Sequence, residues 1–87
     1  MSRFYVINYK IKYEKEIDQG KLLGECTFYP KKEIRVSTSD KNMESTLIHE
    51  IIHAFAYEYD IPLSEKKVLR LERAIFRLLK KNNWKLS

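Results

Sequence analysis

Residues 37–62 read STSDKNMESTLIHEIIHAFAYEYDIP, and the architecture of the chain can be worked out from this stretch. It opens with a cluster of residues that favour helix N-caps, Ser37-Thr38-Ser39-Asp40. Beyond this cluster, apolar residues recur at the helical period, and Asp60-Ile61-Pro62 ends the pattern. We therefore predict a helix over residues 41–59.

The predicted helix has two chemically different faces. A broad apolar arc, which we expect to pack on a sheet, contains Leu47, Ile48, Ile51, Ile52, Phe55 and Tyr59. The opposite arc contains Thr46, His49, Glu50, His53, Ala56 and Tyr57. Glu58 falls within the apolar arc, and we attribute this to fraying at the end of the helix.

The residues before this helix have the pattern of strands. Residues 3–13 alternate between the two sides of an extended chain, which predicts one strand with a buried face. Residues 14–20 are charged, end in glycine and form a connection. Residues 23–29 and 33–38 flank Pro30-Lys31-Lys32 and are rich in β-branched and aromatic side chains, so we predict a hairpin.

A second helix is predicted over residues 65–82, with Ser64 as its N-cap and a short tail that includes Trp84. Its expected buried stripe consists of Val68, Leu71, Ile75, Leu78 and Leu79. The predicted fold class is α+β, with a small antiparallel or mixed three-stranded sheet packed against two helices. We expect residues 1–87 to form a single domain, because the chain is short and shows no linker or internal repeat.

Composition narrows the classes of protein to consider. The 87 residues are 44% hydrophobic and 33% charged, as in soluble globular proteins. The longest apolar runs have four residues, far below the roughly 20 of a membrane span, so we expect no membrane association and a cytoplasmic location. The single cysteine, Cys26, is interpreted as a small buried strand residue. The net charge of +5 makes an acidic partner worth considering.

The chemistry of the first helix centres on His49-Glu50-Ile51-Ile52-His53. Side chains at i and i+4 project from one face, so both imidazoles can reach one metal ion. Glu50 stands beside that face, where its carboxylate can accept a proton without occupying the metal. Both histidines of the chain belong to this motif, which predicts a zinc site with Glu50 as general base.

A catalytic zinc usually has three protein ligands, so a third is expected outside the motif. Glu72 lies within the apolar stripe of the second helix, where an unpaired carboxylate would be costly, and it is the predicted third ligand. The alternative for Glu72 is a salt bridge. Glu65 lies near the same arc, but the helix dipole accounts for an acid in a first turn. Tyr57, one turn beyond His53, is a candidate transition-state stabiliser, with ordinary packing as its alternative.

The segment Thr46-Leu47-Ile48-His49-Glu50-Ile51-Ile52-His53-Ala54 resembles the active helix of zincin metallopeptidases. The similarity is to very small phage-type zincin-like proteins, distantly similar to ImmA/IrrE-type and SprT-type peptidases, and covers about residues 24–84. It implies that His49 and His53 bind zinc, that Glu50 activates water and, by analogy with gluzincins, that Glu72 completes the site. Arg73-Ala74 departs from the signature of large gluzincins, and the glycine-and-histidine extension of metzincins is missing.

The resemblance also implies a protein or peptide substrate, a bacterial cytoplasm if the protein is phage-encoded, and a substrate strand added along a sheet edge. Residues 33–38 are the candidate edge. The predicted function is that of a zinc-dependent metallohydrolase, most simply a peptidase.

Two rival functions remain open. A cationic stripe on the second helix, Lys66, Arg70, Arg73, Arg77 and Lys81, joined by Lys80, could meet the phosphates of a nucleic acid. The same stripe is typical of the solvated face of an ordinary amphipathic helix, which is the simpler interpretation. Alternatively, a zincin fold without activity could bind a host protein.

Overall fold

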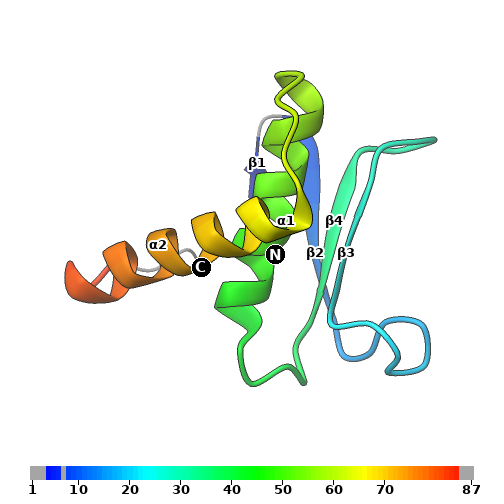
Figure 1. Cartoon of the computed structure of the whole chain (residues 1–87). Helices are drawn as coiled ribbons and strands as arrows, with labels where there is room; N and C mark the ends of the chain where they lie inside the picture. The colour runs from blue at the N-terminus through cyan, green and yellow to red at the C-terminus, as the bar shows by residue number, and fades with distance from the viewer. Residues whose placement is uncertain (1–3, 7, 85–87) are drawn as a thin grey trace.

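The computed structural model describes the backbone of residues 4–6 and all atoms of residues 8–84, and has the predicted α+β architecture. In chain order its elements are β1 (Phe4–Val6), β2 (Tyr9–Glu14), β3 (Gly24–Thr27), β4 (Glu33–Ser37), α1 (Met43–Glu58) and α2 (Glu65–Lys81). The sheet is mixed and has the order β1-β2-β4-β3. Helix α1 lies against one face of the sheet, and α2 packs on α1 (Figure 1).

The three longer strands, β2, β3 and β4, correspond to the three that the sequence predicts, and β1 adds a short fourth. The single strand expected over residues 3–13 is divided by a turn at Asn8, so that β1 folds back antiparallel on β2. Of that expected strand, Arg3 and Ile7 lie outside the described residues. The predicted hairpin is confirmed, because β3 pairs antiparallel with β4 in the register Cys26↔Ile34.

Strand β4 lies inside the sheet, since it pairs parallel with β2 on one side and antiparallel with β3 on the other. The expectation that residues 33–38 form an edge is therefore wrong. The connection from β2 passes beyond the position of β4 before the chain returns as β3. This crossover makes β3 the edge strand on that side of the sheet.

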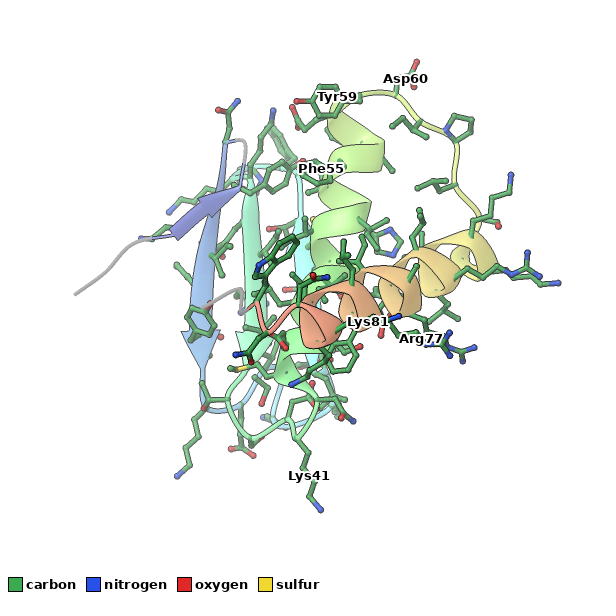
Figure 2. All side chains as sticks on the ribbon, turned by 90° about the vertical axis from the view of Figure 1, so that its left-hand side faces the viewer. Lys41, Phe55, Tyr59, Asp60, Arg77 and Lys81 are labelled. Atoms are coloured by element: carbon green, nitrogen blue, oxygen red, sulfur yellow. The ribbon has the colours of Figure 1, made fainter. Side chains whose placement is uncertain are left out.

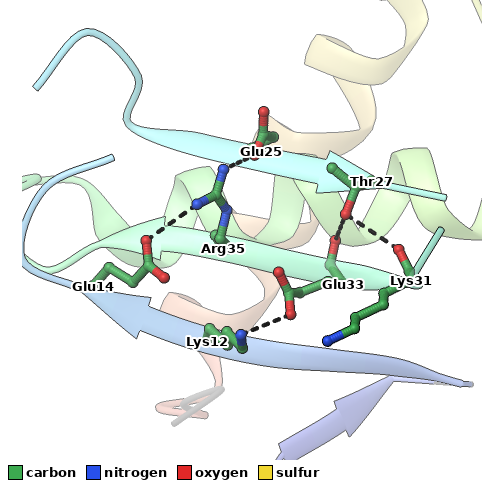
Figure 3. Close-up of polar contacts among 7 residues, drawn as sticks. All are labelled: Lys12, Glu14, Glu25, Thr27, Lys31, Glu33 and Arg35. Carbon is green, nitrogen blue, oxygen red and sulfur yellow. Dashed lines mark hydrogen bonds and ion pairs between the residues drawn. The ribbon is translucent and has the colours of Figure 1, made fainter. Parts of the chain in front are cut away.

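The inward face of the sheet carries the alternating apolar residues that the sequence predicts. Tyr9, Ile34 and Val36 are fully buried there, and Leu47 and Ala54 of α1 pack against them. The outward face is charged: Arg35 lies between Glu14 and Glu25, and Lys12 pairs with Glu33, as Figure 3 shows. One covered and one wet face explain the period of two in β2 and β4.

Helix α1 is buried on two sides, because it separates the sheet from α2. Ile48 and Ile52 face away from the sheet and form a second cluster with Val68 and Leu79 of α2. The expected apolar arc is therefore shared between two partners. Phe55 and Tyr59, at the C-terminal end of that arc, extend beyond both partners and are exposed (Figure 2).

The start of α1 is capped differently from the expectation. The helix begins after Asn42, whose side chain makes no capping hydrogen bond. Asp40 instead accepts hydrogen bonds from the backbone N–H of Asn42 and from the hydroxyl of Thr46. The cap-forming residue thus lies within the predicted cluster, but two positions before the N-cap.

Glu58 is held in place rather than frayed. Its carboxylate accepts a hydrogen bond of 2.9 Å from the buried hydroxyl of Tyr9 and pairs with Lys32 Nζ at 2.8 Å. These two contacts lower the pKa of the Glu58 carboxyl. A carboxylate within the apolar arc is tolerated because sheet residues provide its partners.

Helix α2 has the predicted N-cap, since the Ser64 hydroxyl accepts a hydrogen bond from the backbone N–H of Lys67 at 3.2 Å. Its expected buried stripe is only partly correct. Val68 and Leu79 are buried, but Leu71 and Leu78 are exposed because α2 packs mainly on α1. Within the described part of the chain, no helix is both long and apolar enough to cross a bilayer.

Candidate metal centre

The two histidines of the motif come together on α1 as their spacing predicts. Residues 49–53 are helical, and the imidazole centroids of His49 and His53 lie 4.9 Å apart. Their Nε2 atoms are 3.2 Å apart. Two nitrogen atoms at this distance repel each other unless a proton or a cation lies between them. The pair is therefore placed to provide two ligands to one metal ion.

Glu65, at the first position of α2, completes the cluster. Its two carboxylate oxygens lie 2.8 Å from His49 Nε2 and 3.4 Å from His53 Nε2. One ligand atom from each of the three residues lies within 4.8 Å of the other two. The Ser64 cap positions this carboxylate, because it fixes the residue at which the α2 helix begins.

The distances can be compared with the ligand spacing of a tetrahedral zinc. Zinc–ligand bonds of about 2.0–2.1 Å place neighbouring ligand atoms roughly 3.3–3.4 Å apart. The two Nε2 atoms are 3.2 Å apart, and each lies 2.8 or 3.4 Å from a different oxygen of Glu65, so the cluster approaches this spacing, with one ligand atom from each residue within 4.8 Å of the others. Two imidazole nitrogens and one carboxylate are also the ligand set of a well-known class of catalytic zinc sites.

Glu72 has a different place from the one that the sequence predicts. Its carboxylate lies 2.8 Å from Nδ1 of His49, the ring nitrogen that does not face His53, and it also accepts a hydrogen bond from Ser45. This geometry does not support Glu72 as the third ligand, because Nδ1 and Nε2 lie on different sides of the ring. It makes Glu72 an orienting group for His49 instead.

Sequence reasoning passed over Glu65 because the helix dipole offered a sufficient explanation for an acid in a first turn. A signal for it was present, since Glu65 and Glu72 are seven positions apart and so share one face of α2. That face turns toward His49, so one glutamate reaches each ring nitrogen.

The cluster is open on one side. The side chains of His49 and His53 are 19% and 33% exposed, whereas that of Glu65 is 62% exposed. Glu72, behind His49, is only 17% exposed. A ligand or substrate atom can therefore approach from the side of Glu65, as a catalytic metal site with an open position requires.

Glu50 lies between α1 and the edge strand β3. A Cβ atom placed on Gly24 would be 3.3 Å from Glu50 Oε2 and only 2.6 Å from Thr46 Cγ2, so β3 approaches the helix here as closely as a glycine allows. Burial raises the pKa of the Glu50 carboxyl, with smaller contributions from Glu65, Glu25 and Glu72, while His49 acts in the opposite direction. Such a carboxylate is suited to accept a proton.

The outer edge of β3 offers backbone hydrogen bonds beside Glu50. The N–H of Ser37 donates to the carbonyl of Leu23, so these two residues form a hydrogen-bonded pair of the β3–β4 ladder. By the alternation of an antiparallel ladder, the backbone groups of Gly24 and Cys26 point away from β4. An added peptide strand would pair with these two residues.

Tyr57 is exposed, and its ring stacks on Phe28 with centroids 4.1 Å apart. This contact places the ring over the end of β3, one turn of α1 beyond His53. A role in transition-state stabilisation stays a prediction.

Comparisons of the chain with protein-family models, curated proteins and solved structures found no match. The resemblance to zincin peptidases therefore stays a prediction from the motif.

Proposed function

We propose that this protein is a zinc-dependent metallohydrolase, most simply a peptidase, with His49, His53 and Glu65 as metal ligands. The observation that carries the proposal is the convergence of two Nε2 atoms and a carboxylate within 4.8 Å, next to an open side of the molecule. Zinc, when bound, supplies a Lewis acid for the scissile carbonyl and lowers the pKa of a water molecule.

The remaining residues have distinct parts in this proposal. Glu72 accepts a hydrogen bond from the Nδ1–H of His49, and in this tautomer the Nε2 lone pair is free for the metal. Glu50 accepts a proton from the attacking water and transfers it to the leaving amine. The substrate backbone lies along β3, paired with Gly24 and Cys26, which brings its carbonyl between Glu50 and the ligand cluster.

Metal binding is tested first with purified protein and added zinc. We expect one zinc per chain by elemental analysis and a higher melting temperature with zinc than with chelator. At a free zinc concentration 100 times the Kd, the gain in the free energy of unfolding is about 2.7 kcal/mol. For a domain of this size each kcal/mol corresponds to roughly 4–8 °C in melting temperature. Identical melting curves in zinc and in chelator would refute the metal site.

The assignment of Glu65 and Glu72 is tested by comparing two isosteric variants. Glu65→Gln removes a ligand charge and should abolish tight zinc binding. Glu72→Gln leaves the three ligands in place and should weaken zinc binding by about 10- to 100-fold, as for an outer-sphere partner. Glu16→Gln, in an exposed loop, is the matched control and should bind zinc like the unaltered protein. A larger loss in Glu72→Gln than in Glu65→Gln would reverse the assignment.

The catalytic step is tested with Glu50→Gln. This variant should keep one zinc per chain and its melting temperature in zinc, but lose cleavage of an unstructured protein such as casein. If the unaltered zinc-bound protein cleaves and Glu50→Gln cleaves equally fast, the proposed mechanism is wrong. If the zinc-bound protein cleaves no peptide or ester substrate, the hydrolase function fails and a binding function of the same fold takes its place.

A further inference from the structure

The whole net charge of the chain resides in α2. This helix contains seven Lys and Arg residues and two Glu residues, whereas the other 70 residues contain ten basic and ten acidic side chains. The two glutamates, Glu65 and Glu72, both turn toward α1, where they contact His49. The charged residues on the outward face of α2 are therefore all cationic, and they share the exposed surface of the helix with Leu69, Leu71 and Leu78.

This cationic face consists of a central stripe, Lys66, Arg70, Arg73, Arg77 and Lys81, with Lys67 and Lys80 at its margins. All seven residues are exposed, and Figure 2 shows Arg77 pointing away from the body of the protein. Within residues 8–84, Lys80 pairs with Glu44 at 3.8 Å and the other six have no acidic partner. Cationic side chains are common on the solvated face of an amphipathic helix, but an unmixed stripe goes beyond what solvation requires, because like charges at i and i+4 repel.

The shape of the stripe matches a regular polyanion. From Lys66 to Lys81 the helix rises about 22 Å, at 1.5 Å per residue. Phosphates of one DNA strand are spaced about 3.4 Å along the duplex axis, so the stripe spans roughly six of them. Three of its five residues are arginines, whose planar guanidinium groups bind phosphate through two hydrogen bonds.

The same face is poorly suited to other anionic partners. Protein interfaces place charges around an apolar centre, but the centre of this stripe is cationic throughout. Single-stranded nucleic acid is held by stacking on aromatic rings, and the one aromatic residue of α2, Phe76, packs in the cluster against α1. A membrane-bound helix inserts a broad apolar face, whereas the most apolar positions of α2, Val68 and Leu79, are buried against α1 and only Leu69, Leu71 and Leu78 remain exposed.

We infer that the cationic face of α2 is a docking surface for the phosphate backbone of a nucleic-acid duplex. Contacts to the phosphate backbone carry no sequence information, so we expect binding to be independent of base sequence. The surface is opposite to Glu65 and Glu72 on the same helix, so a bound duplex leaves the candidate metal centre accessible. The inference rests on charge and spacing alone and does not depend on the proposed hydrolase function.

The test is fluorescence anisotropy of labelled duplex DNA in two unrelated sequences, titrated with metal-free protein between roughly 50 and 200 mM salt. The triple variant Arg70→Gln, Arg73→Gln, Arg77→Gln removes the centre of the stripe with a residue that is also a good helix former. A matched control, Lys15→Gln, Lys21→Gln, Lys31→Gln, removes the same charge from exposed loop positions away from α2. Melting curves verify that both variants are folded.

The unaltered protein should bind both duplexes equally, with an affinity that falls steeply with salt. The slope of log K against log salt should decrease by about 2.7 in the arginine variant, at ~0.9 for each lost phosphate contact. The lysine control should keep most of the slope. Equal losses in the two variants would overturn the proposal, because net charge alone would then explain binding. Three other results would also overturn the proposal: absence of duplex binding at the lowest salt, tighter binding to single strands than to duplex, and binding to anionic phosphatidylglycerol vesicles but not to DNA.

Discussion

Replacing Gly24 with alanine should destabilise the protein through one specific contact. The added Cβ would lie 2.6 Å from Thr46 Cγ2, well inside ordinary van der Waals contact, and 3.3 Å from Glu50 Cγ. Thr46 cannot easily turn away, because its χ1 is restricted by β-branching and its hydroxyl bonds to Asp40. Either the edge strand β3 or helix α1 must therefore shift.

The size of the effect follows from two opposing contributions. Overpacking of this kind costs about 1–3 kcal/mol. Alanine also reduces the conformational entropy of the unfolded chain, which stabilises the folded state by about 0.4–1 kcal/mol. We therefore expect Gly24→Ala to lower the free energy of unfolding by roughly 1–2 kcal/mol, and the melting temperature by about 4–8 °C for each kcal/mol.

The assay is urea denaturation of Gly24→Ala, Thr46→Ser and the double variant, treated as a double-mutant cycle. Thr46→Ser deletes the clashing methyl group and keeps the hydroxyl that bonds to Asp40. The double variant should regain most of the stability that Gly24→Ala loses. Additive effects in the cycle, or a Gly24→Ala protein as stable as the unaltered one, would refute the close approach of β3 to α1.

Three further predictions concern single side chains. Lys32 and Tyr9 lower the pKa of Glu58 in the folded state below its value in the unfolded chain. Glu58 therefore stabilises the fold above the unfolded-state pKa, and this stabilisation is lost as the pH falls through the folded-state pKa. In chemical denaturation between neutral pH and about pH 3, Glu58→Gln should therefore lose less free energy of unfolding on acidification than the unaltered protein. An equal loss of stability in the two proteins would contradict the contact with Lys32. Ser64→Ala should cost about 1 kcal/mol in urea denaturation, because it removes the cap of α2, and no change would argue against that cap. Cys26 is half-buried, and this burial, reinforced by Glu50, raises its pKa to about 12. Iodoacetamide should therefore label it slowly in native protein at pH 8 and rapidly in denaturant, and rapid native labelling would contradict the raised pKa.

The local structure of this protein could be predicted from its sequence because short-range patterns specify it. The β-branched and aromatic residues on either side of Pro30-Lys31-Lys32 placed β3 and β4, and the period near 3.6 placed both helices within a few residues of their observed ends. The pairing of His49 with His53 follows from helix geometry alone, since four positions make about one turn. For the same reason Glu50 could be placed beside the histidines before any tertiary structure was known.

Other features depend on how the elements pack, and one-dimensional patterns do not contain that information. The sequence suggested β4 as an edge strand, but β3 occupies that edge in the structure. The order of strands depends on how the whole sheet pairs, which local patterns do not specify. The apolar stripe of α2 indicated which side is buried but not how much of it, and α1 covers only Val68 and Leu79 fully.

The choice between Glu65 and Glu72 depended on tertiary structure in the same way. Both lie on one face of α2, so periodicity cannot separate them. Only the position at which α2 crosses α1 brings Glu65 to Nε2 of His49 and Glu72 to Nδ1. The sequence alone therefore determined the helix that presents two imidazoles together. The packing of a second helix, set by contacts among residues far apart in the chain, determined which carboxylate meets them.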